Sequence, residues 1–250
     1  MEKMKKIIIS VFLPIHILSF YLVFQNRNSP NKKIVHQSQK ETKSSLVTGI
    51  DVSHHQGDID WKKVKESGVD FCFIKATEGS TFLDKKFKKN VVECKKNGIL
   101  IGSYHFYKAK SNPNKQFENF SKNVKITDLD FPPVIDLEYH TNECLKNPKN
   151  KNKFIKDLKI FEKLVRDYYG VSPIFYTNPK FYNNLLKDDF NNELWICDLK
   201  GNSDLITDTT KWLFWQHNFN GKINGINGDV DMNMFNGSLD SLNKIVINKK

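Results

Sequence analysis

The feature that most restricts the fold is a regular alternation of short apolar runs and helical patterns, which starts at Leu46 and continues almost to the C-terminus. Short apolar runs between turn residues are typical of buried strands, and longer stretches with apolar residues three or four positions apart are typical of helices. The expected strands are residues 46–52, 71–76, 100–106, 134–138, 174–177, 194–197, 213–217 and 230–235. The expected helices are residues 60–67, 84–97, 113–123, 152–169 and 179–186.

This order predicts an α/β fold with a largely parallel sheet, because a strand followed by a helix returns to its sheet through a right-handed crossover. Five strand–helix units come first, and three strands without full helices between them follow. Eight strands are the number that closes a small barrel. We therefore expect an irregular TIM-like barrel of five βα units followed by three strands, with an open doubly wound sheet as the alternative. No glycine-rich phosphate-binding motif opens any expected helix, so nothing indicates nucleotide binding.

The net charge of +11 suggests an anionic partner until its distribution along the chain is considered. Residues 1–45 hold eight basic and two acidic residues, and Lys244, Lys249 and Lys250 add three positive charges at the other end. Residues 46–243 therefore carry only about +2, which is ordinary for a globular domain. The charge belongs mostly to the ends, and we expect no nucleic-acid partner.

The N-terminus has the pattern of an export segment. Three lysines precede the apolar stretch 7–24, as in the charged and apolar regions of a signal peptide. Its 18 residues are just enough to cross a bilayer, and no small-residue cleavage site follows. We expect residues 1–24 to be a signal peptide or an N-terminal membrane anchor, 25–45 a flexible linker and 46–243 a single folded domain. The protein would then be secreted or held at the cell envelope.

The cysteines and histidines indicate no metal site. An even number of cysteines in an exported protein permits disulfides, but a buried free cysteine is also common, so the pairing stays open. The four cysteines are Cys72, Cys94, Cys144 and Cys197. Their spacings fit no zinc pattern, and His54 and His55 are the one close pair among the seven histidines. We expect no cofactor, no metal and a monomer.

Four acidic residues are placed to meet at one end of the predicted barrel. Asp136 and Glu138 lie two positions apart in strand 134–138, so both side chains face the same side. Neighbouring carboxyls raise the pKa of one of the two, and a raised carboxyl beside an ionised one can act as a general acid. Asp51 and Asp231 belong to the first and last strands, which are neighbours in a closed barrel. All four would converge at the C-terminal ends of the strands, where such barrels hold their active sites.

Aromatic residues follow the same strand ends. The flat faces of aromatic rings beside carboxylates suit the apolar face of a sugar ring. Half or more of these rings are expected to be core residues, because aromatic side chains dominate protein cores. The individual sugar-contact candidates on this ground are Tyr104, Tyr139 and Tyr176.

The chain resembles the glycoside hydrolase family 25 lysozymes, also called Chalaropsis-type muramidases. The matching motifs are residues 49–57, 73–79, 102–106, 133–138, 174–177, 194–196, 215–216 and 230–233. Each motif is weak alone, but they occur in the family order over residues 47–236, and the ordered set is specific. The resemblance implies the barrel described above. It also implies hydrolysis of the β-1,4 bond between N-acetylmuramic acid and N-acetylglucosamine in peptidoglycan.

The resemblance further implies roles for individual residues. Glu138 would be the general acid, and Asp136 the nucleophile or the group that orients the N-acetyl group of the substrate. Asp51 and Asp231 would position the substrate, the water molecule and the catalytic pair. Net retention is the family expectation, but the outcome stays open because side-chain rotamers set the carboxyl separation. The expected substrate contacts are Glu78, Tyr104, Tyr139, Tyr176, Trp195 and Gln216.

Two other functions compete with a muramidase. The first is a catalytically silent peptidoglycan-binding module, against which the presence of all four acids argues. The second is a hydrolase of another N-acetyl glycan such as chitin, although the motif of family 18 chitinases is not met around Glu138. Six lysines between residues 142 and 159 form either a solvated helix face or a basic rim beside the acidic cleft. The biological role, whether wall remodelling, competition or lysis, stays open.

Overall fold

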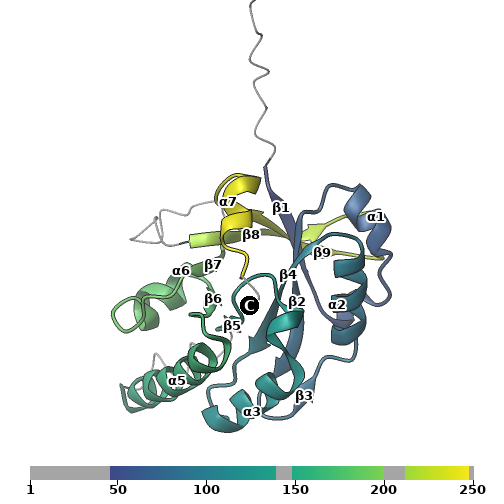
Figure 1. The fold of residues 1–250 in the computed structure, drawn as a ribbon. Helices are drawn as coiled ribbons and strands as arrows, with labels where there is room; N and C mark the ends of the chain where they lie inside the picture. The colour runs from purple at the N-terminus through teal and green to yellow at the C-terminus, as the bar shows by residue number, and fades with distance from the viewer. Residues whose placement is uncertain (1–45, 139–147, 200–211, 248–250) are drawn as a thin grey trace, which may run out of the picture. The chain divides into compact units, whose positions relative to one another are not determined.

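A computed structural model describes residues 46–138, 148–199 and 212–247, and Figure 1 shows their fold. One sheet has the strand order β1-β9-β8-β7-β6-β5-β4-β2-β3, and β1 also pairs with β2, so eight strands close into a ring. The strands are β1 Thr48–Val52, β2 Phe71–Glu78, β3 Phe82–Leu83, β4 Leu100–Phe106, β5 Val134–Asp136, β6 Ile174–Thr177, β7 Leu194–Cys197, β8 Trp212–Gly221 and β9 Val230–Phe235. Strand β3 pairs only with β2 and stays outside the ring.

The ring is parallel except at β9, which runs antiparallel to both β1 and β8. Each of the first five strands of the ring is followed by a helix, whereas β7, β8 and β9 follow one another in the chain without a described helix between them. This arrangement confirms the predicted α/β barrel of five βα units and three final strands. The alternative of an open doubly wound sheet is wrong, because the pairing of β1 with β2 closes the ring.

The helices surround the ring, as Figure 1 shows. They are α1 Trp61–Glu66, α2 Phe87–Lys96, α3 Pro113–Asn123, α5 Pro148–Tyr169, α6 Pro179–Phe181 and α7 Leu239–Lys244, with 3-10 turns at His54–Gln56 and Ile126–Asp128 and a π-turn at Tyr182–Leu186. Their starts follow the sequence. The side chains of Asp60, Asn112 and Asn178 accept backbone N–H groups of the first turns of α1, α3 and α6, which satisfies donors that a helix leaves unpaired.

Aromatic side chains fill the interior of the ring. The ring of Phe73 stacks on Trp195 with centroids 4.2 Å apart, and Phe214 meets Phe73 edge-on at 4.9 Å. The interior is so crowded that β4 carries a glycine there, since a Cβ at Gly102 would lie 2.4 Å from carbons of the Phe73 ring. A second apolar cluster fills the space between the strands and the helices outside them. The interior of the closed strand barrel is therefore a packed core, and a ligand can bind only at the mouth of the barrel.

Several elements differ from the sequence prediction near the acids. Strand β5 ends at Asp136, two residues before the predicted end. The helix predicted over 84–97 begins at Phe87, because the Asp84 carboxylate accepts the backbone N–H groups of His54 and Lys86 instead of joining the helix. No periodic pattern predicts β3 or α7, because elements of two and six residues are too short to show one.

The remaining structural expectations concern the ends and the cysteines. Residues 1–45 and Cys144 lie outside the described ranges, so the predicted export segment and linker stay predictions. Within the described ranges, no helix is long and apolar enough to cross a membrane. Cys72, Cys94 and Cys197 are free thiols. Helix α7 crosses the predicted domain end at residue 243, and the backbone N–H of Ile247 donates to the Asp130 carbonyl at 2.7 Å.

Candidate active site

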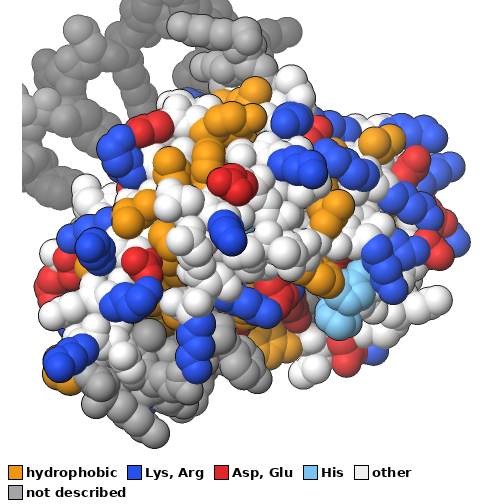
Figure 2. Space-filling view, turned by 90° about the horizontal axis from the view of Figure 1, so that it is seen from below, with side chains coloured by type: hydrophobic (Ala, Val, Ile, Leu, Met, Phe, Trp, Pro, Cys, Tyr) orange, Lys and Arg blue, Asp and Glu red, His pale blue; other side chains and the backbone are white. Residues whose placement is uncertain are grey.

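The mouth of the barrel at the C-terminal ends of the parallel strands brings the four predicted acids together. Asp231 differs from the expectation, because β9 runs antiparallel and Asp231 reaches this mouth from the N-terminal end of its strand. Asp51 on β1 lies directly opposite Asp231 on β9, although 180 residues separate them in the chain. Asp136 is the last residue of β5, and Glu138 follows two positions later. All four line one pocket with a volume of about 210 Å³. Figure 2, seen from below Figure 1, shows a face on which acidic side chains lie beside lysine, histidine and hydrophobic side chains.

The chain stays extended for two residues after β5, which places Glu138 on the same side as Asp136. The backbone N–H of Leu137 donates to the carbonyl of Tyr176 at 2.8 Å, and the Leu137 carbonyl accepts the hydroxyl of Thr177 at 3.0 Å. The side chain of Leu137 is buried in the apolar layer between strands and helices. Alternation therefore turns the two flanking carboxyls into the pocket, as the period of two predicts.

Asp51 is held by two side-chain amides that are themselves oriented by aromatic residues. Gln216 Nε2 and Asn233 Nδ2 each donate to Asp51 Oδ2 at 2.8 Å. Trp195 Nε1 donates to Asn233 Oδ1 at 2.7 Å, and the Tyr176 hydroxyl donates to Gln216 Oε1 at 2.6 Å. Each aromatic donor occupies the amide oxygen, so the amide nitrogen must face Asp51. This buried network fixes both the position of Asp51 and its role as an acceptor.

The environment shifts the pKa of all four acids in the same direction. Burial raises the pKa of Asp51, Asp136 and Glu138, and it raises the pKa of Asp231 to about 6. The charge of Asp231 adds to the effect at Asp51, and the charge of Glu138 adds to the effect at Asp136. Lys75 acts in the opposite direction and lowers the pKa of Asp136 and of Glu138. A carboxyl with a raised pKa can hold a proton near neutral pH and deliver it to a substrate.

Lys75 is a pocket residue that the sequence reasoning did not single out, although it lies in the motif 73–79. Its ammonium group is 2.8 Å from Glu78 Oε2 and 4.8 Å from the centre of the Phe106 ring. Glu78 also pairs with Lys108 at 2.6 Å, so this predicted substrate contact is engaged with two lysines and does not line the pocket. Its observed contacts make Glu78 a support for Lys75.

The other predicted substrate contacts divide by burial. Tyr104 lines the pocket with the acids. Trp195 is 2% exposed, and Tyr176 and Gln216 are buried, so the three belong to the network around Asp51. Tyr139 lies outside the described residues. Asn233 completes the network and was not predicted, although it ends the motif 230–233.

The remaining wall of the pocket comes from the turn after β1. Ser53, His55 and Gln56 line the pocket there. The Ser53 hydroxyl accepts the backbone N–H of His55 at 3.2 Å, and Gln56 Oε1 accepts the backbone N–H of Ser53 at 2.9 Å. This reciprocal cap stiffens the turn. The signal that could have identified these residues is their place in the motif 49–57.

Asp136 has an unsatisfied atom. Its Oδ1 is buried and has no hydrogen-bond partner among the described residues. An unpaired buried acceptor is costly, so such atoms in folded proteins call for an explanation. Because Asp136 lines the pocket, the arrangement leaves one acceptor of the pocket wall without a donor. Over residues 46–138, 148–199 and 212–247, no group of three or more His, Cys, Asp or Glu side chains is arranged to hold a metal ion.

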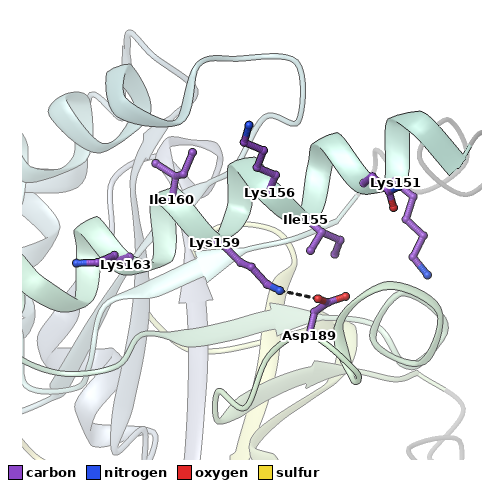
Figure 3. A pocket seen from close by; sticks show the side chains of 8 residues that line it. Lys151, Ile155, Lys156, Lys159, Ile160, Lys163 and Asp189 are labelled. Carbon is purple, nitrogen blue, oxygen red and sulfur yellow. Dashed lines mark hydrogen bonds and ion pairs between the residues drawn. The ribbon is translucent and has the colours of Figure 1, made fainter.

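A larger hollow, of about 570 Å³, lies along α5, and Figure 3 shows the side chains that line it. Lys159 Nζ reaches across it to Asp189 Oδ1 at 2.6 Å, and Lys151 Nζ donates to the Asn184 carbonyl at 3.0 Å. The hollow includes three lysines of the expected basic stretch. It shares no residue with the acid pocket, so its size does not make it the catalytic site. Its lining residues are Lys151, Asn152, Ile155, Lys156, Lys159, Ile160, Lys163 and Asp189.

Comparisons with known proteins agree with this geometry. The model of the glycosyl hydrolases family 25 matches residues 50–226. The uncharacterized protein YegX of Escherichia coli K12 is 34% identical over 208 residues, which are 81% of this chain and 74% of that protein. Lysozyme M1 of Streptomyces globisporus is 29% identical over 204 residues, which are 78% of this chain and 69% of that protein.

A solved structure shows the same architecture. The family 25 glycosyl hydrolase of Bacillus anthracis superposes with a TM-score of 0.73 at 34% identity, covering 80% of this chain and 94% of that one. The family match spans most of the barrel, and it includes Asp51, Asp136 and Glu138. The chain therefore belongs to glycosyl hydrolase family 25, and it is a glycoside hydrolase of the lysozyme type.

Proposed function

We propose that this lysozyme hydrolyses the β-1,4 bond between N-acetylmuramic acid and N-acetylglucosamine in peptidoglycan, with Glu138 as the general acid. The observation that carries the assignment is the placement of Asp136 and Glu138 in one small pocket with Asp51 and Asp231, where burial raises the pKa of every carboxyl. Paired carboxyls in different environments are the common machinery of glycoside hydrolysis.

Glu138 suits the acid role because it is the less buried member of the pair, where a glycosidic oxygen can reach it. Its pKa is raised, which favours the protonated form, but the pKa of Asp136 is raised too, so the choice between the two rests on exposure and on the family resemblance. Its proton passes to the glycosidic oxygen as the bond from that oxygen to the sugar C1 breaks. The positive charge that develops on the sugar is then met in one of two ways. Asp136 attacks C1 directly, or it orients the N-acetyl group of the substrate so that the acetyl oxygen attacks.

The unpaired Oδ1 of Asp136 supports the second route, because a substrate amide N–H is the kind of donor that this oxygen lacks. Either route ends when Glu138, now a carboxylate, takes a proton from the water molecule that attacks C1. We assign Asp51 and Asp231 to positioning. Asp51 is fixed by two amides, and Asp231 lies directly opposite it at the pocket wall.

The test is Glu138→Gln, which keeps the shape of the side chain and removes its acid. We expect the release of new reducing ends from purified cell walls to fall at least about a hundredfold, the usual contribution of a general acid. Glu93→Gln is the matched control, because Glu93 is a surface carboxylate on α2 away from the pocket, and it should cleave like wild type. Circular dichroism confirms that both variants fold.

Three results would contradict the assignment in different ways. Equal activity of Glu138→Gln and wild type removes Glu138 from the acid role. Wall binding by a folded wild type without new reducing ends makes the protein a binding module. Faster cleavage of chitin oligosaccharides than of wall glycans moves the substrate to another N-acetyl glycan.

We also propose that residues 1–24 direct export, as a cleaved signal or a retained anchor, and that 25–45 form a linker. The catalytic domain, expected over 46–243 and extended by the rest of α7 and Ile247, would act as a monomer at the cell envelope. The charge and apolar pattern of the N-terminus supports this delivery route. Mass spectrometry of the mature N-terminus decides between cleavage and anchoring, and an unprocessed protein retained in the cytoplasm would refute both.

A further inference from the structure

A short hairpin beside the acid pocket presents two apolar side chains to solvent. Strand β3 turns back on the end of β2, and its two residues, Phe82 and Leu83, are 40% and 42% exposed. Helix α3 fixes the backbone of the hairpin, because Asn119 Nδ2 donates to the carbonyls of Gly79 and Phe82, each at 3.0 Å. An exposed aromatic ring on a fixed backbone is a feature of binding surfaces, since it offers contact area at little cost in conformational entropy.

Two histidines extend this surface toward the pocket. The His54 ring lies 5.9 Å from the Phe82 ring and 4.0 Å from the His55 ring, measured between centroids. The buried Asp84 carboxylate fixes His54 twice, by accepting its backbone N–H at 2.9 Å and by contacting its Nδ1 at 2.7 Å. With Nδ1 engaged, the opposite ring nitrogen Nε2 has no partner among the described side chains and is free for a ligand hydroxyl or amide. We call Phe82, His54 and His55 the hairpin platform.

The platform is continuous with the acid pocket. His55 lines the pocket, and Lys75, another lining residue, has its ammonium group 5.7 Å from the centre of the Phe82 ring. At about 210 Å³ the pocket is smaller than the roughly 300–1,000 Å³ of sites that enclose a drug-sized ligand. A glycan cut at this pocket has a sugar on each side of the broken bond, so at least one ring must rest on the adjoining surface.

We propose that the hairpin platform is a glycan subsite that binds an N-acetylhexosamine ring of the strand outside the acid pocket. The inference rests on the proposed function and adds a specificity surface to it. The face of an aromatic ring carries partial negative charge and attracts the C–H groups on the apolar face of a sugar ring. The Nε2 atom of His54 binds a polar group at the rim of the same sugar. The contact contributes affinity for longer strands and takes no part in bond breaking.

The test compares Phe82→Ala with Tyr168→Ala, which removes an aromatic ring that is 51% exposed near the C-terminal end of α5. Binding of peptide-free wall glycans of two and four disaccharide units is measured by calorimetry in the Glu138→Gln background, where turnover does not interfere. Phe82→Ala should raise the Kd of the longer glycan roughly three- to tenfold, the factor expected for one aromatic contact. Tyr168→Ala should not change it, and Phe82→Tyr should restore it.

The kinetics of the active enzyme give an independent readout. Loss of a contact that is equal in ground state and transition state raises KM and leaves kcat unchanged, so Phe82→Ala should show this split. If wild type cleaves glycans and Phe82→Ala matches Tyr168→Ala in Kd and KM, the subsite is wrong and the muramidase assignment stands. If wild type binds glycans through Phe82 without cleaving them, the muramidase assignment fails and the subsite stands. If wild type neither binds nor cleaves them, both fail.

Discussion

Replacing His105 by glutamine is expected to remove much of the acid sensitivity of the fold between pH 7 and pH 5. His105 lies on β4 and is fully buried. Its Nε2 is 3.2 Å from Gln116 Oε1, an acceptor, so Nε2 carries the proton and Nδ1 accepts the Thr77 hydroxyl at 2.7 Å. In this neutral form both ring nitrogens are hydrogen-bonded and no charge is buried. Burial accordingly lowers the pKa of His105 to about 4, from 6.5 in an unfolded chain.

The direction of the effect follows from where the proton binds first. As the pH falls below 6.5, His105 takes up a proton in the unfolded chain but not in the folded protein. Proton binding therefore stabilises the unfolded state and lowers the free energy of unfolding. The contribution of neutral His105 to the free energy of unfolding is complete above pH 6.5. It is lost as the pH falls toward 4, the pKa of His105 in the folded protein. With these two pKa values, proton linkage predicts a loss of about 2 kcal/mol in the free energy of unfolding between pH 7 and pH 5.

Urea unfolding of wild type and His105→Gln at pH 7, 6 and 5, followed by tryptophan fluorescence, measures this directly. The variant starts less stable, because glutamine does not reproduce both hydrogen bonds, but the gap between the two proteins should narrow by about 2 kcal/mol on acidification. The four pocket acids are common to both proteins and cancel in the comparison. Parallel stability curves, or a His105 ring that titrates near pH 6.5 by NMR, would refute the reasoning.

Two further predictions concern the pocket and the core. In Lys75→Met the pKa of Asp136 and Glu138 should rise, because Lys75 lowers both, so the alkaline limb of the kcat/KM profile should move to higher pH. If the alkaline limb of the profile stays at the same pH, deprotonation of Glu138 does not determine that limb. Gly102→Ala should lower the free energy of unfolding by about 1–3 kcal/mol, because the new methyl group overlaps the Phe73 ring, and a thermal melt equal to wild type would contradict this.

The positions of the acids could be predicted because they depend on regular geometry. The period of two places Asp136 and Glu138 on one side of an extended chain, and closure of the ring sets Asp51 opposite Asp231. Contacts between irregular segments carry no such period. The pairing of His54 with Asp84 joins two turns thirty residues apart, and the sequence offers no signal for it.

The burial of the predicted sugar contacts has a physical cause in the same geometry. Below the mouth of the barrel, an aromatic residue on a barrel strand points either to the packed interior or to the layer under the helices, and neither direction reaches a ligand. Tyr104, near the end of β4, is the predicted contact that does line the pocket. Trp195 and Tyr176 point inward, so they stack in the core and act on the pocket only through the amides that hold Asp51. Outside the closed barrel of strands, an aromatic side chain can meet the face of a sugar. Phe82 satisfies that condition because β3 lies outside the ring and projects beside the pocket. In this barrel, the ends of the barrel strands, with Glu138 just beyond β5, therefore set the charge of the site, and the elements outside the barrel set how much glycan it holds.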